Sequence, residues 1–199
     1  MKRYYEIIEQ LKLQEEFAIY LASSSINAPY HNLWHTINMI EDCYDGYVHE
    51  TGSDFGCKNL IVAAIFHDID HTQGKYSDDV NIKIALGKVG ELPYDTEEIK
   101  NIIRATQYPY VIPADELSLE QKIIRDADLM SSFKSTLLPH CLVGLSEELN
   151  IDLVKMFDGQ ERFIENSEFN TQWGRNNFNK YINDERKEVR FLKTLKIED

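Results

Sequence analysis

Apolar residues recur along most of the chain at the three- and four-residue spacing of amphipathic helices. Short breaks rich in glycine, proline and small polar residues separate these segments. No run of useful length alternates between apolar and polar positions, as a half-buried strand would. The pattern therefore predicts one all-α domain, a helical bundle over residues 1–199. Helices are expected over residues 2–22 (one or two), 32–44, 60–71, 81–86, 97–107, 117–133, 151–168 and 176–196.

The most apolar stretch, residues 60–66, leads directly into His67 and Asp68, and His71 follows one turn later. On a helix, His67 and His71 continue the apolar face that begins at Leu60. Burying a carboxylate beside imidazoles costs free energy unless something compensates for it, and a metal ion is the usual compensation. A core histidine with an ordinary hydrogen-bond partner is the alternative for a single histidine. The adjacent histidine and aspartate favour a metal site.

A second pair of histidines lies at the start of the helix predicted from Asn32, which is a good N-cap residue. His31 precedes this cap and His35 lies in the first turn, so both imidazoles can lie near one helix start. Neutral imidazole is the commonest metal ligand, and a second histidine nearby can donate a proton. The alternative is that Tyr30, Trp34 and the two histidines only pack the entrance of the helix.

A later helix carries an aspartate within its apolar stripe. This residue, Asp126, needs a partner if it is buried. Arg125 or the backbone would satisfy it, and a metal ion is the sharper hypothesis. Asp128 lies about 200° around the same helix, where a solvated acid or a residue that supports a ligand is expected. We therefore expect Asp126 to face the metal.

Composition narrows the class of protein. The chain carries 21 basic and 34 acidic residues, which give a formal net charge of −13. This balance argues against an extended nucleic-acid surface and against binding to an anionic membrane, whereas a small phosphate ligand beside a metal ion is compatible with it. The sequence shows no apolar run of membrane-spanning length and no signal-peptide core. Three widely spaced cysteines form no zinc-ligand pair, so we expect a reduced, cytoplasmic protein of undetermined oligomeric state.

Three motifs follow one another in the chain: Tyr30-His31-Asn32-x-x-His35, then His67-Asp68-x-x-His71-x-x-Gly74, then Asp126. Together, over about residues 28–133, they resemble the signature of the HD superfamily of metal-dependent phosphohydrolases, including its cyclic-nucleotide phosphodiesterase branch. The resemblance implies a small, all-helical member with one metal centre. A mixed nitrogen and oxygen ligand set suits Mn²⁺, Zn²⁺, Mg²⁺, Fe²⁺ or Co²⁺ without selecting among them. The implied metal ligands are His35, His67, Asp68 and Asp126.

The resemblance also implies roles for the residues around the metal. His31 resembles the general acid that protonates the leaving oxygen. His71 resembles the histidine that orients the attacking water or the phosphate, and Asp68 both binds the metal and steadies that water. Lys75 and Asn81 fall where small members of the superfamily carry a polar loop and a helix start that line the site, so both are expected to bind substrate.

We therefore expect a metal-dependent phosphohydrolase, either a phosphomonoesterase or a phosphodiesterase. It would act on a nucleotide or a related small phosphoester by attack of a metal-bound water. One alternative is a catalytically weak regulatory module that keeps the metal. The other is a di-iron oxygenase of the same superfamily, which would need further histidines, and residues 72–138 contain none.

Overall fold

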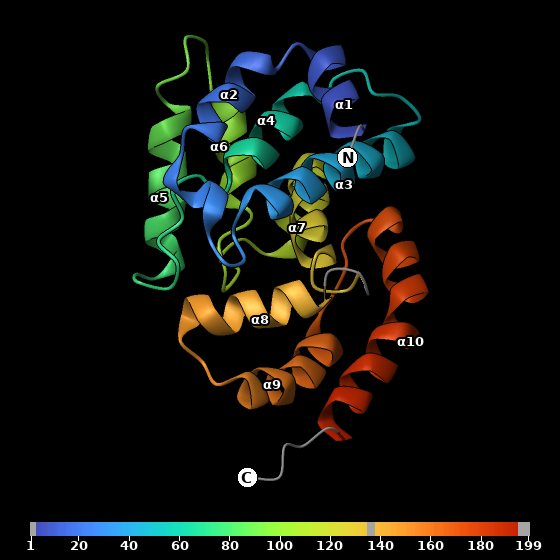
Figure 1. Cartoon of the computed structure of the whole chain (residues 1–199). Helices are drawn as coiled ribbons and strands as arrows, with labels where there is room; N and C mark the ends of the chain where they lie inside the picture. The colour runs from blue at the N-terminus through green and yellow to red at the C-terminus, as the bar shows by residue number, and fades with distance from the viewer. Residues whose placement is uncertain (1–2, 135–137, 195–199) are drawn as a thin grey trace.

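The structure is a computed structural model that describes residues 3–134 and 138–194. Within these residues the chain forms ten α-helices and two 3-10 helices and no β-strand (Figure 1), which confirms the all-α prediction. None of these helices is both long enough and apolar enough to cross a membrane. The α-helices are α1 (Arg3–Leu11), α2 (Gln14–Leu21), α3 (Leu33–Thr51), α4 (Lys58–Phe66), α5 (Asp78–Val89), α6 (Glu97–Arg104), α7 (Leu119–Met130), α8 (Leu138–Leu149), α9 (Leu153–Asn166) and α10 (Gln172–Thr194), and the 3-10 helices are η1 (Ser24–Asn27) and η2 (Ala114–Glu116).

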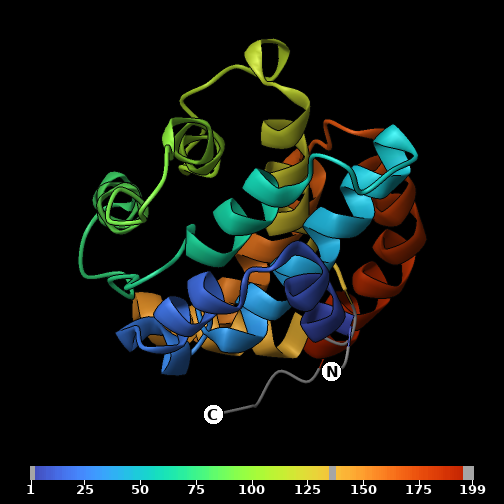
Figure 2. The same ribbon diagram turned by 90° about the horizontal axis from the view of Figure 1, so that it is seen from above.

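Helix α4 lies at the centre of the core. Every residue from Leu60 to Phe66 is buried, and the helix packs against α2, α3, α5, α6 and α7. Figure 2 shows α4 in the middle of the molecule, with α5 and α6 on one side. A helix that is apolar all round is stable only when it is covered on every side. Because each large apolar side chain buried here contributes about 1.5–3 kcal/mol, this short segment fixes the positions of the helices around it.

The prediction of a helix over residues 60–71 is wrong at its C-terminal end, because α4 stops at Phe66. Tight turns follow, in which the N–H of Ile69 donates to the carbonyl of Phe66 and that of His71 to the carbonyl of Asp68, both at 3.1 Å. Asp70 has a φ of 54°, a left-handed conformation that a helix cannot contain and that aspartate tolerates. The side chains after Phe66 are therefore gathered at the end of α4 rather than spread along it.

Helix α3 crosses in front of α4 and α7 (Figure 1), and it packs against both. Asn32 is its N-cap, as predicted, since its side chain accepts hydrogen bonds from the backbone N–H groups of Trp34 and His35 at 2.8 and 3.2 Å. This cap satisfies two donors that the first turn leaves open. It also fixes the first turn of α3, which carries one of the predicted metal ligands.

The C-terminal helices lie below α3 in the view of Figure 1. The predicted segments 151–168 and 176–196 correspond to α9 and α10, except that residues 195–196 lie outside the described residues, and α8 is not among the predicted helices. This helix approaches the start of α3 closely, because a Cβ atom at Gly144 would lie 2.6 Å from the carbonyl oxygen of Pro29. Only glycine permits that approach, and it brings the side chains of α8 next to the segment that carries His31.

Candidate metal centre

Three helices bring two histidines and two aspartates together. The ligand atoms of His35 on α3, His67 at the end of α4 and Asp128 on α7 all lie within 4.8 Å of one another. Asp68 Oδ2 lies 2.8 Å from His67 Nε2 and 3.2 Å from His35 Nε2. His35 Nε2 lies 3.1 Å from His67 Nε2 and 3.4 Å from Asp128 Oδ1. The predicted histidines and Asp68 therefore do converge on one point.

These separations are the ones expected for the ligands of a single ion. Two atoms that are each bound about 2.0–2.2 Å from one ion, at octahedral or tetrahedral angles, lie roughly 2.8–3.6 Å apart. The measured distances of 2.8–3.4 Å fall in this range. The two Nε2 atoms, 3.1 Å apart, need either a proton or a metal ion between them, because two bare lone pairs would repel each other. The arrangement therefore fits a cation among these four side chains.

The surroundings of His67 determine which of its nitrogens is available. Its Nδ1 lies 2.9 Å from the carbonyl oxygen of Ala64, so Nδ1 carries the proton and donates it. The lone pair of Nε2 then points toward His35 and Asp68. A backbone acceptor behind a ligand histidine commonly holds the imidazole in the metal-binding tautomer. The chemistry of this donor set fits a divalent metal ion.

The charges of the site favour a cation at its centre. Burial alone would lower the pKa of His35, but hydrogen bonds to Asp128 and Asp68 raise it to about 10. Burial alone would raise the pKa of Asp68, but the neighbouring His67 and His31 hold it well below its usual range, so Asp68 stays ionised. The side chains of Asp68 and Asp128 are 16% and 32% exposed, so the site opens to solvent on their side.

The structure does not bring Asp126, the predicted metal ligand, to His35 and His67; Asp128 lies there instead. Both carboxylate oxygens of Asp126 face the start of α10. Oδ1 accepts hydrogen bonds from the backbone N–H and the side-chain amide of Asn170, both at 2.8 Å. Oδ2 accepts them from the backbone N–H and the hydroxyl of Thr171, at 2.8 and 2.7 Å. The reason for the difference is that α7 packs against α3, α4, α6 and α10, so its apolar stripe does not mark one face.

Beside the metal ligands lies a pair formed by His31 and Glu148, a buried residue of α8. Glu148 Oε2 lies 2.6 Å from His31 Nδ1, and Oε1 accepts the backbone N–H groups of Tyr30 and His31 at 2.7 and 2.9 Å. Burial opposes ionisation of Glu148, but these hydrogen bonds lower its pKa below the ordinary value. Among the described residues nothing bonds to His31 Nε2, so that nitrogen is available for proton transfer.

His71 stacks on His31, with ring centroids 3.7 Å apart and planes 29° apart. Its Nδ1 accepts a hydrogen bond from the N–H of Gln73 at 3.1 Å, and its Nε2 lies 2.8 Å from the side-chain nitrogen of Asn81. Burial, reinforced by the charge of His31, lowers the pKa of His71 to about 4. His71 is therefore an uncharged partner for His31 at neutral pH.

The three residues His31, His71 and Glu148 also bring potential ligand atoms within 4.8 Å of one another. The geometry favours a proton-transfer group over a second metal site. The 2.6 Å between His31 and Glu148 is a hydrogen-bond distance, shorter than the spacing of two ligands on one ion. The Nδ1 lone pair of His71 is already used by a backbone N–H.

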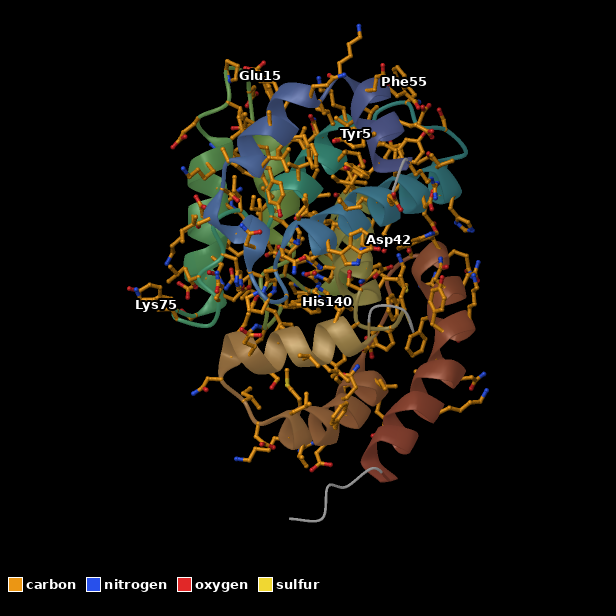
Figure 3. All side chains as sticks on the ribbon, in the orientation of Figure 1. Tyr5, Glu15, Asp42, Phe55, Lys75 and His140 are labelled. Carbon is orange, nitrogen blue, oxygen red and sulfur yellow. The ribbon has the colours of Figure 1, made fainter. Side chains whose placement is uncertain are left out.

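The two residues predicted to bind substrate differ in position. Asn81 is buried and lies in the site, where its Oδ1 accepts the N–H and the hydroxyl of Thr72 at 3.0 and 2.7 Å while its Nδ2 faces His71. The side chain of Asn81 therefore contacts His71 and does not face an open surface. Lys75 extends from the edge of the molecule (Figure 3), with its Nζ 5.3 Å from the ring centroid of Tyr76. The structure does not bring Lys75 to the metal ligands.

Two residues of α8 escaped the sequence analysis, although both lie at the site. Glu148 is one, and the other is His140, whose Nε2 lies 3.2 Å from the side-chain nitrogen of Asn32 above α8 (Figure 3). In a chain with 34 acidic residues, nothing in the sequence distinguishes the one glutamate that is buried at the site.

The chain matches no protein-family model, and no curated protein matches it.

Proposed function

We propose that the protein is a metal-dependent phosphohydrolase of the HD type that acts on a nucleotide or a related small phosphoester. The observation that supports this function is a four-residue cation site directly beside a histidine held by a buried glutamate. Hydrolysis of a phosphoester needs both parts, since positive charge must meet the phosphoryl oxygens and a proton must reach the leaving oxygen.

The cation would be held by His35, His67, Asp68 and Asp128, a set that suits Mn²⁺, Zn²⁺, Mg²⁺, Fe²⁺ or Co²⁺. A divalent ion held there would supply positive charge to a phosphoryl oxygen and would lower the pKa of a water molecule. The ionised carboxylate of Asp68 would accept a hydrogen bond from such a water and orient it. Substrate enters on the side where the carboxylates of Asp68 and Asp128 are exposed.

The proton for the leaving oxygen comes from His31 Nε2. Glu148 accepts the hydrogen bond of Nδ1 and thereby fixes the direction of Nε2. His71 is neutral and stacked against the ring, so it supports His31 without adding a second charge. The backbone N–H of Gln73 holds His71 in turn, by donating to its Nδ1.

The test is turnover of p-nitrophenyl phosphate, bis-p-nitrophenyl phosphate and a panel of nucleotides, by protein freed of metal and then supplied with each divalent ion. Activity is expected only with a metal ion and is expected to vanish in Asp68→Ala. His31→Ala should lower kcat on nucleotides by about 10²–10⁴, keep its metal content, and lose less on p-nitrophenyl substrates, whose leaving group departs without help. His49→Ala, an exposed histidine at the far end of α3, is the matched control.

Two results would overturn the proposal. Metal binding without turnover of any substrate would make the protein a regulatory module. A coloured, iron-containing protein that consumes dioxygen would make it an oxygenase.

A further inference from the structure

A hollow of about 420 Å³ lies between α9, the end of α7 and the segment that precedes α7, and its volume is within the size range of small-molecule sites. Tyr108 and Tyr110, from the segment between α6 and α7, form one wall. Arg162 and Phe163 of α9 form another, and Leu129 of α7 lies between them. We call this hollow the tyrosine–arginine cavity.

The cavity adjoins the proposed metal ligands through α7. Leu129, which lines it, directly follows the ligand Asp128. The pKa of Tyr110 is raised first by burial and then by the charge of Asp128, with a smaller effect of Asp126. A phosphate at the metal centre would therefore have the cavity as its neighbour.

A chain of hydrogen bonds also joins the cavity to the catalytic histidines. The N–H of Tyr108 donates to Asp78 Oδ2 at 2.6 Å. Asp78 Oδ1 accepts from Asn81 Nδ2 at 3.3 Å, and that nitrogen lies 2.8 Å from His71 Nε2. The loop that carries the tyrosines is thus fixed relative to His71 rather than free to drift.

The two tyrosines form an aromatic corner. Their ring centroids lie 5.5 Å apart with the planes 86° apart. Arg125 supports the ring of Tyr110, with its guanidinium carbon 3.9 Å from the centroid, and is itself held by the carbonyls of Ala105 and Ile112. A fixed ring that lines a cavity is a stacking surface for a planar ligand, and nucleobases of every kind stack on tyrosine.

Arg162 gives the cavity a positive group. Among the described residues no carboxylate pairs with its guanidinium, although the chain has 34 acidic residues against 21 basic ones. An arginine left unpaired at a cavity in so acidic a protein is available for an anionic ligand, and its fork of donors matches a phosphate group.

We propose that the tyrosine–arginine cavity binds the nucleoside part of a nucleotide, with the base on Tyr108 and Tyr110 and a second phosphate on Arg162. This inference rests on the proposed function, because it assumes that the scissile phosphate lies at the metal centre. It adds that the substrate is a nucleotide with at least two phosphate groups, rather than a simple sugar phosphate or a nucleoside monophosphate.

The experiment is calorimetric titration of the metal-free, full-length protein with the diphosphates of adenosine, guanosine, cytidine and uridine, and with inorganic phosphate. At least one diphosphate should bind the parent. Arg162→Ala and Tyr108→Ala should each weaken that binding about tenfold. Lys155→Ala removes an exposed cation from the same helix outside the cavity and should leave the affinity unchanged. Tyr110→Phe keeps the ring and should also bind normally.

The inference is overturned if none of the four diphosphates binds the parent, or if Arg162→Ala and Tyr108→Ala bind as the parent does. Turnover of bis-p-nitrophenyl phosphate, measured separately with Mn²⁺, distinguishes this failure from failure of the proposed function. If the protein turns over this substrate but the cavity variants bind diphosphates as the parent does, only the proposal for the cavity fails. If the variants weaken binding as expected but there is no turnover, only the proposed hydrolase activity fails.

Discussion

Asp126 and Asp128 lie two residues apart on α7, and a helix turns about 200° between them. The carboxylate of Asp126 is fully buried and accepts hydrogen bonds from Asn170 and Thr171, the two residues that precede α10. The other is one-third exposed and lies 3.4 Å from a ligand histidine of α3. Two identical side chains therefore lie on a structural face and on a candidate metal-binding face of the same helix.

The difference lies in what satisfies each charge. Asp126 has its hydrogen-bonding capacity filled by backbone and side-chain donors within the protein, so it offers nothing to an ion. A side chain at Gly174 would run into this carboxylate, which shows how closely α10 is packed on it. Among the described residues, the side chain of Asp128 has one recorded close partner, His35, and is 32% exposed. Burial alone is thus a poor guide to metal ligands, and unfilled acceptor capacity is a better one.

The largest effect is expected on the metal-binding face. Asp128→Ala should reduce metal-dependent turnover by about 10³-fold or more, because a metal centre supplies several kcal/mol of transition-state stabilisation. Its free energy of unfolding without metal should change by less than about 1 kcal/mol, since the side chain is partly exposed. Steady-state kinetics and urea titration measure the two quantities. Full activity in this variant would remove Asp128 from the site.

The structural face should respond in the opposite way. Asp126→Ala should lower the free energy of unfolding by about 4 kcal/mol, because several buried donors lose their acceptor together. The folded fraction of this variant should bind metal with the same stoichiometry as the parent protein. Urea titration followed by circular dichroism gives the stability. An unchanged unfolding midpoint would mean that the contacts to α10 are incidental.

Asp42 is a second buried acid with a structural contact, and it extends the comparison to the pH dependence of stability. Burial raises the pKa of Asp42 from 3.8 to about 6, against the opposing effect of Lys134, whose Nζ lies 2.6 Å away. The folded protein then binds more protons than the unfolded chain between these values, so the contribution of Asp42 to stability falls as pH rises through this window. Asp42→Asn does not titrate and should gain about 3 kcal/mol relative to the parent between pH 4 and pH 7. A constant difference between the two proteins across this range would refute the assignment.

The smallest effect is expected one step away from the metal. Glu148→Gln should lower kcat about 10–100-fold, because His31 loses the carboxylate that orients its ring. Metal content should stay at the parent value. Glu147→Gln changes an exposed neighbour on α8 and serves as the control. Equal activity in the two variants would show that Glu148 anchors α8 and has no role in catalysis.

The sequence predicts most of the helices because their apolar spacing is regular, and it predicts the cap at Asn32 because that signal is local. The histidine ligands and Asp68 were found because they adjoin apolar segments or a cap. The sequence favours Asp126 over Asp128 as a metal ligand, because periodicity shows which residues share a helix face but not which neighbouring element that face contacts.

The remainder of the site depends on contacts that are distant in sequence. Glu148 and His31 are 117 residues apart, and they meet only because α8 approaches the start of α3 at Gly144. Helix α8 itself contains a glycine and a proline, which obscured its pattern. The tyrosine–arginine cavity joins a loop before α7 to α9, and no local pattern in either segment indicates the other.

The most direct test of the account is the metal content of three proteins: the parent, Asp126→Ala and Asp128→Ala. Each is loaded with Mn²⁺ or Zn²⁺, dialysed, and analysed by elemental mass spectrometry on the folded fraction. The account predicts that the parent and Asp126→Ala retain the ion at equal stoichiometry, whereas Asp128→Ala loses it. Retention by Asp128→Ala together with loss by folded Asp126→Ala would contradict the account and restore Asp126 as the ligand.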